Sequence, residues 1–164
     1  MSGYEKSVLV VGIGNELLGD EGLGVRVARR LLAARSLLPA HVAVLECGTC
    51  LLDIVPEMSR CSHVIIVDAI RGGREAGTVY RAEMPANLSG QFQAGPSLSL
   101  HQWGVMETLQ AAKLLGLSPP RITVLGAEPE RAHPSLELSP ALAHAEAKIV
   151  DTLLSELGAG RAEP

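Results

Sequence analysis

The chain has 164 residues, enough for one domain with a continuous core and short for two. Apolar residues make up 47% of it and aromatic residues only 2%, so its core must be aliphatic, which favours an α/β fold over an aromatic-rich β-sandwich. The formal net charge is -4, and the 14 Lys and Arg residues are scattered, with no basic run joining aromatic residues that could stack on bases. We therefore expect no nucleic-acid partner.

The sequence also argues against a membrane or secreted protein. No run of about 18 apolar residues is present, so we expect no membrane-spanning segment. The short polar stretch from Met1 to Lys6 lacks the pattern of a signal peptide. Three cysteines, an odd number, are expected to be reduced thiols rather than a disulfide framework. These features predict a cytoplasmic protein, which we expect to be monomeric.

The first half of the chain alternates predicted strands with predicted helices. Residues 7–13 form a continuous apolar run that suits a central strand buried on both faces. Apolar residues then recur at helical spacing over residues 23–38, with arginines on the other side. A second strand is expected at 41–46, a helix at 51–60 and a third strand at 63–68. This order implies parallel strands joined by right-handed crossovers.

The second half begins with weaker signals. An alternating strand at residues 77–82 is expected at a sheet edge, in a direction that the sequence does not fix. Residues 84–100 are rich in Pro, Ser, Gly and Gln without periodicity, which predicts a functional or mobile loop. Another strand is expected at 121–127, after a helix whose apolar positions are Val105, Leu109, Ala112 and Leu115.

The last predicted helix opens at Ser139-Pro140, because serine can cap free amides and proline needs no donor there. It ends at Gly158, and its buried face comprises Leu142, Ala145, Ile149 and Leu153. We therefore predict one α/β domain over residues 1–158 and a disordered tail over 159–164. The expected architecture is a three-layer α/β/α sandwich around a mainly parallel twisted sheet of about five strands.

Carboxylates cluster at one predicted edge of this sheet. If the strand order begins 2-1-3, strands one and three are neighbours, and residues beyond their carboxyl ends share a crevice. Asn15, Glu16, Asp20 and Glu21 follow the first strand, and Asp68 ends the third. Two carboxylates in a partly dry cleft repel, so one must take a proton or the pair must hold a cation.

His101 can complete a metal site with these carboxylates, since it lies where the long loop turns into a helix. Glu21, Asp68 and His101 offer two oxygens and a nitrogen, a set able to bind nickel, zinc or another borderline divalent ion. Each residue also has a structural interpretation. Asp20 and Glu21 can serve the dipole of the following helix, Asp68 can cap a turn, and His101 can be a cap or surface residue.

Two other patterns are weak. Cys47 and Cys50 form a C-x-x-C without a second pair, and Cys61 is isolated, so incidental small residues are the favoured interpretation, although a soft metal ligand at Cys47 is an alternative. The Gly12-Ile13-Gly14 turn and Glu46 suggest a dinucleotide site. Leu17, however, stands at the third glycine position, and Asp20 and Glu21 would oppose a pyrophosphate.

The segment from Gly12 to Gly24, GIGNELLGDEGLG, closely resembles the G-[IV]-G-N-x-L-x-x-D-E-G-x-G signature of hydrogenase maturation proteases. Further resemblances to that family are Cys47-Gly48-Thr49 to its G-G-T segment, Ile66-Val67-Asp68-Ala69 to the end of its third strand, and Ser99-Leu100-His101-Gln102-Trp103-Gly104 to its S-x-H-Q-x-G loop. Their order and approximate spacing hold over nearly the whole chain.

This resemblance implies a hydrolase, an aspartic-type endopeptidase that makes a single cut near the C-terminus of the nickel-loaded large subunit of a nickel-iron hydrogenase. Its metal-contacting positions fall on Glu21, Asp68 and His101. Nickel is then delivered by the substrate, and no organic cofactor is expected. Catalytic roles are implied for the same three residues, with Asp20 or Glu21 as the candidate general base. The alternatives are a nucleotide-binding module and a nickel chaperone without peptidase activity.

Overall fold

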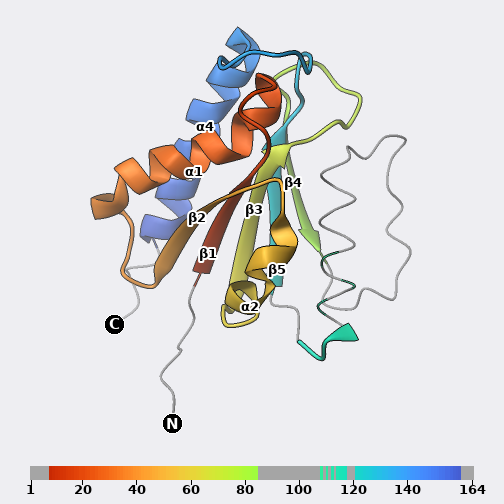
Figure 1. The fold of residues 1–164 in the computed structure, drawn as a ribbon. Helices are drawn as coiled ribbons and strands as arrows, with labels where there is room; N and C mark the ends of the chain where they lie inside the picture. Colours follow the sequence, from red (N-terminus) through yellow and green to blue (C-terminus); the bar gives the residue numbers. More distant parts are fainter. Residues whose placement is uncertain are drawn as a thin grey trace.

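The computed structural model describes residues 8–84, 108, 110, 112, 114–117 and 121–159. A five-stranded sheet runs through them in the order β2-β1-β3-β5-β4 (Figure 1). Its strands are β1 (Val8–Ile13), β2 (Val42–Gly48), β3 (His63–Ala69), β4 (Val79–Met84) and β5 (Arg121–Ala127). The first three and β5 are parallel, whereas β4 pairs antiparallel with β5 at the edge. The predicted 2-1-3 order and edge strand are therefore confirmed, and the direction of β4 is now fixed.

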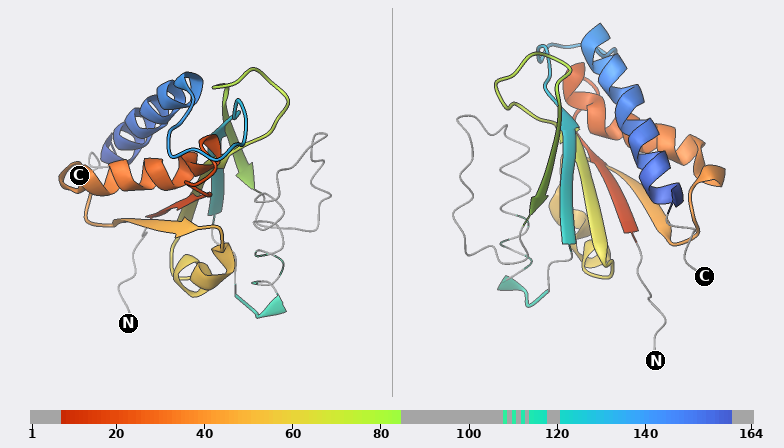
Figure 2. Two further views of the ribbon diagram at one scale, coloured as in Figure 1. Left: turned by 45° about the horizontal axis from the view of Figure 1, so that its top comes forward. Right: turned by 180° about the vertical axis from the view of Figure 1, so that it is seen from behind.

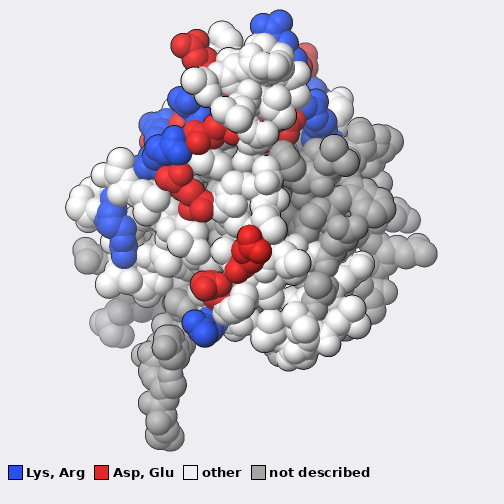
Figure 3. All heavy atoms as spheres, in the orientation of Figure 1, with Lys and Arg blue, Asp and Glu red and all other residues white. Residues whose placement is uncertain are grey.

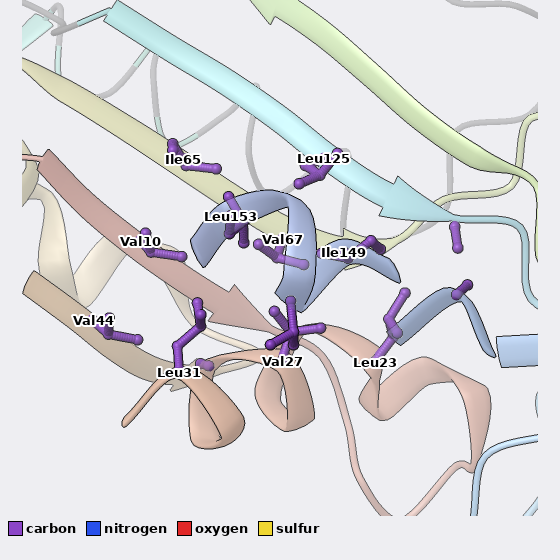
Figure 4. Packing of buried hydrophobic residues seen from close by; sticks show 14 of the residues in the cluster. Val10, Leu23, Val27, Leu31, Val44, Ile65, Val67, Leu125, Ile149 and Leu153 are labelled. Atoms are coloured by element: carbon purple, nitrogen blue, oxygen red, sulfur yellow. The ribbon is translucent and has the colours of Figure 1, made fainter. Parts of the chain in front are cut away.

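One face of the sheet is covered by two long helices. Helices α1 (Leu23–Ala33) and α4 (Pro140–Ala159) contact each other and lie on the same side of the sheet (Figure 2). Their buried residues interdigitate with alternate residues of the strands in one aliphatic cluster (Figure 4). The predicted inner face of the last helix is confirmed, since all four of its residues are at most 1% exposed: Leu142, Ala145, Ile149 and Leu153.

The opposite face has its own core. A 3-10 turn, η3 (Leu51–Ile54), and the short helix α2 (Val55–Met58) cover it, with Leu51 and Met58 buried against the sheet. The strand residues on this side are those that alternate with the first cluster, including Val11, Val64 and Ile66. Helical layers on both faces confirm the predicted α/β/α sandwich.

Two predicted helices are shorter than expected. The helix predicted at 23–38 ends at Ala33 and is followed by a 3-10 turn, η2 (Arg35–Leu37). That turn ends at Leu38, whose backbone is extended because Pro39 follows it. The helix predicted at 51–60 is divided into η3 and α2. Pro56 lacks the amide needed to continue hydrogen bonding from the preceding turn, but suits the start of a new helix.

The remaining differences are at the ends of elements. Leu115 was expected on a buried helical face, but it lies in a turn and is 71% exposed, while Ala112 of the same helix is buried. Helix α4 continues one residue beyond the predicted end, to Ala159. The described residues do not include Val105 or Leu109 of the predicted helix, the loop from residue 85 to 100, or the tail beyond 159. In the described part of the chain, no helix is both long enough and apolar enough to cross a membrane.

Candidate active site

Glu21 is held at the carboxyl end of β1. It belongs to η1 (Asp20–Gly22), a 3-10 turn between β1 and α1, and its side chain is buried. The carbonyl oxygen of Glu21 accepts a hydrogen bond from the amide of Asn15 (2.9 Å). A Cβ on Gly14, whose φ is +138°, would lie 2.0 Å from the same oxygen, so this close return of the chain requires glycine.

Asp68 lies at the corresponding end of β3. The register of β1 and β3 pairs Gly12 with Val67, so Asp68 follows directly beside the end of β1. Its side chain is 1% exposed, and its Oδ1 accepts a hydrogen bond from the amide of Ala69 (2.8 Å). Glu21 and Asp68 therefore occupy the same edge of the sheet, as the strand order predicted, while their chemical roles stay predictions.

Arg71 is a neighbour of Glu21 that the sequence did not reveal. Its Nη2 donates a hydrogen bond to Oε1 of Glu21, forming an ion pair. The side chain of Arg71 is 36% exposed and that of Glu21 only 9%, so the guanidinium lies toward solvent from the carboxylate. In the sequence, Arg71-Gly72-Gly73 carried only the signal of a turn.

Glu128 fixes the loop that carries Arg71. Its carboxylate is buried and Oε2 accepts hydrogen bonds from the amides of Gly72 (2.7 Å) and Arg74 (3.2 Å) and from the hydroxyl of Tyr80. Burial, followed by this bond to Glu128, raises the pKa of Tyr80. Sequence reasoning missed Glu128, although it directly follows β5 at the same sheet edge, the signal that identified Asp68.

The carboxylate of Asp20 contacts a distant part of the chain. It is 1% exposed, and Oδ1 accepts from the amide of Ser139 (2.7 Å). Its Oδ2 accepts from the amide of Glu130 (2.8 Å) and the hydroxyl of Ser139 (3.0 Å). Ser139 Oγ accepts in turn from the amide of Leu142 (3.3 Å), which confirms the predicted cap of the last helix. These contacts tie η1 to the start of α4, and a role for Asp20 as general base stays a prediction.

Arg29 of α1 joins two other acids near this edge. It pairs with Glu16 (2.7 Å) and Glu46 (2.9 Å), and its hydrogen bonds to these two carboxylates raise its pKa. Glu46 is the residue that a dinucleotide site would use for a ribose hydroxyl. Because it is paired with Arg29, the geometry does not favour that alternative. On the face shown in Figure 3, basic and acidic side chains are mixed near the upper end of the molecule.

The cysteines near β2 carry free thiols. Cys47 donates a hydrogen bond from Sγ to the carbonyl oxygen of Cys50 (3.1 Å). Burial raises the pKa of Cys47, with smaller contributions from Cys50 and Asp53. The thiol form is therefore favoured over the thiolate that binds metals, which weakens the alternative of a soft ligand at Cys47. Cys61 also carries a free thiol.

The third predicted metal contact, His101, lies outside the described residues. Among the residues that are described, no group of three His, Cys, Asp or Glu side chains is arranged to hold a metal ion. The antiparallel direction of β4 carries the chain toward Met84, away from the edge that holds Asp68. Of the three predicted metal contacts, the structure therefore describes two, the carboxylates of Glu21 and Asp68.

Comparison with known proteins gives consistent matches. A family model described as hydrogenase maturation protease matches residues 25–156. The chain is 35% identical over 158 residues to the hydrogenase 2 maturation protease of Escherichia coli, covering 94% of this chain and 90% of that protein. It is 37% identical over 125 residues to the hydrogenase expression/formation protein HupD of Rhodobacter capsulatus, covering 74% of this chain but only 57% of that relative.

Solved structures agree with this assignment. The hydrogenase maturating endopeptidase HybD from Escherichia coli superposes with a TM-score of 0.76 at 29% identity, covering 96% of this chain and 95% of that one. A hydrogenase 2 maturation peptidase from Thaumarchaeota archaeon SCGC_AB-539-E09 gives a TM-score of 0.69 at 30% identity, covering 93% and 99%. The family match, the relatives and the shared fold lead to one conclusion: this chain belongs to the hydrogenase maturation protease family.

Proposed function

We propose that the protein is an endopeptidase that removes the C-terminal extension of the nickel-loaded large subunit of a nickel-iron hydrogenase by a single peptide-bond cleavage. The observation that carries this proposal is the pair of buried carboxylates, Glu21 and Asp68, at the adjacent ends of β1 and β3 in a chain of this family. The chain spans little more than half of HupD, so the substrate is inferred from the family and the site together.

In this proposal, Glu21, Asp68 and His101 contact nickel that is already bound to the substrate. Two buried carboxylates at adjacent strand ends suit such a role, because carboxylate oxygens are ligands for divalent metal ions. Two oxygens and one imidazole nitrogen match the preference of a borderline divalent ion and leave positions for groups of the substrate. The metal is then cargo that reports on the loading of the precursor.

The hydrogen bonds of Asp20 argue against its use as the general base in the proposed reaction. Hydrolysis needs a group that takes a proton from the attacking water and a route that returns a proton to the amine leaving group. Both oxygens of Asp20 already accept hydrogen bonds from Ser139 or Glu130, so using it as a base would disturb the start of α4. We assign Asp20 to positioning Glu21, its neighbour in η1.

The decisive experiment is incubation of the purified protein with the precursor, with and without nickel, followed by intact-mass measurement. Loss of one C-terminal fragment only from the nickel-loaded precursor supports the proposal. A nickel chaperone, in contrast, would bind the loaded precursor and leave its mass unchanged. Cleavage at several sites, or equal cleavage without nickel, would also contradict it.

We further propose that the enzyme acts as a monomer in the cytoplasm. Its three free thiols suit a reducing compartment.

A further inference from the structure

Arg71 is placed to act on Glu21, which the proposed function makes a metal contact. The guanidinium donates a hydrogen bond to the buried carboxylate from its solvent side. A guanidinium is a positively charged group, so this contact places a positive charge beside Glu21. A cation that approaches Glu21 from solvent therefore meets Arg71.

The position of Arg71 is fixed by the fold on both sides of the residue. The amide of Ile70 donates to the carbonyl oxygen of Ala127 (2.9 Å), and the amide of Gly72 donates to the carboxylate of Glu128 (2.7 Å). Most ion pairs between exposed side chains are loose, because two long chains must be ordered to form them. Here the backbone of Arg71 is already held, so less ordering is needed to keep the pair.

We propose that Arg71 is a resident counter-cation for Glu21 that competes with free divalent ions and leaves the carboxylate when the metal of the substrate docks. This inference rests on the proposed function, in which Glu21 contacts nickel. A divalent ion bound to Glu21 and a guanidinium on the same carboxylate repel each other at close range, so each weakens the binding of the other. Arg71 is thus a residue that determines specificity.

This competition distinguishes a free metal ion from the same metal bound in the precursor. A free ion brings only its own affinity for Glu21 and Asp68, which Arg71 reduces. A metal fixed in a docked precursor is presented with the binding energy of the whole protein interface, which can displace the guanidinium. The enzyme would then engage loaded precursor without being blocked by free nickel or zinc.

The test is a calorimetric titration of nickel chloride into metal-stripped full-length protein. The variants are Arg71→Gln, Arg71→Met, Glu21→Gln and the double variant Arg71→Gln/Glu21→Gln. Arg74→Gln is the matched control, since it removes the same charge from the same loop. We expect either Arg71 substitution to tighten nickel binding by at least about tenfold, because it removes a positive charge from beside the carboxylate. Arg74→Gln should change it by less than about threefold.

The outcomes separate the two proposals. If Arg71→Gln tightens binding and the double variant loses that gain, the inference holds. If both folded Arg71 variants bind nickel as weakly as the wild type or more weakly, while Glu21→Gln abolishes the binding, Arg71 does not compete but Glu21 remains a metal contact. If Glu21→Gln has no effect in either background, Glu21 is not a metal contact and that part of the proposed function fails. Thermal melting of each variant shows that it is folded.

Discussion

Gly24, at the start of α1, lies so close to β3 that a Cβ on it would stand 2.0 Å from the carbonyl oxygen of Val67. The same Cβ would stand 2.3 Å from the carbonyl oxygen of Ile13. Because both obstacles are backbone, Gly24→Ala must move α1 away from the sheet. We expect the free energy of unfolding to fall by more than about 3 kcal/mol, measured by urea denaturation.

Gly158 in α4 provides the matched control for this substitution. A Cβ there meets nothing within 4 Å, and alanine is the better helix former. Gly158→Ala should therefore leave stability unchanged or raise it by up to about 1 kcal/mol. An equal fall in the free energy of unfolding in the two variants would show that the close approach of α1 to β3 is not what requires glycine at position 24.

The second prediction concerns Asp20. Replacing it with alanine leaves the amides of Glu130 and Ser139 without their buried acceptor. We expect Asp20→Ala to lower the free energy of unfolding by about 2–4 kcal/mol, whereas Asp53→Ala, at an exposed acid, should cost no more than about 0.5 kcal/mol. A fully stable Asp20→Ala protein that no longer cleaves the precursor would instead favour a direct catalytic role.

The third prediction is a pH dependence far from the active site. His63 begins β3, and its Nε2 lies 2.8 Å from Oγ1 of Thr123. Burial, together with Arg121, lowers the pKa of His63. Because the pKa of His63 is lower in the folded state, the unfolded state takes up a proton more readily. The contribution of His63 to stability is therefore complete above the unfolded pKa of about 6.5 and is lost as the pH falls through the folded pKa.

Denaturation at a series of pH values between about 5 and 8 tests this sign. His63→Gln keeps a hydrogen-bonding side chain but cannot titrate, so its stability should fall less steeply toward acid pH than that of the wild type. His133→Gln, at an exposed histidine, should retain the wild-type slope. Parallel curves for wild type and His63→Gln would contradict the prediction.

The fourth prediction concerns His101 and rests on the sequence. If His101 supplies the nitrogen ligand, His101→Ala should sharply reduce processing of nickel-loaded precursor, followed by intact mass. Its effect on the free energy of unfolding should stay below about 0.5 kcal/mol. His133→Ala, at an exposed position, is the control and should cleave normally. An unfolded His101→Ala protein whose remaining folded fraction still cuts would make His101 a structural residue.

The sequence predicted those features that depend on local patterns and on general rules of α/β sheets. Buried apolar runs identified β1, β3 and β5, and the doubly wound order then brought Glu21 and Asp68 to one edge. Helix lengths were predicted less well: Pro56 divides the second predicted helix, and the first ends at Ala33, before the extended Leu38 that precedes Pro39. An apolar period persists through such a break and does not report it.

Arg71 and Glu128 were not predicted as residues of the site, because their partners are distant in the chain. Arg71 meets Glu21 only after β1 and β3 pair, and Glu128 meets Gly72 only after β5 joins them. In a sequence, a single charged residue after a strand looks the same whether its side chain faces solvent, caps a turn or pairs with a distant residue. Applying the strand-end rule to β5 as well as β3 would have singled out Glu128.

The link between Asp20 and Ser139 also sets a limit on when the enzyme can be assembled. Chains emerge from the ribosome N-terminus first, so β1, η1 and α1 are made long before the segment that supplies the partners of Asp20. Until Ser139 arrives and α4 docks on α1, the turn that carries Glu21 lacks the hydrogen bonds that tie it to the start of α4. A nascent or truncated chain should therefore be unable to cut, and proteolytic capacity would arise only when synthesis of the whole domain is complete.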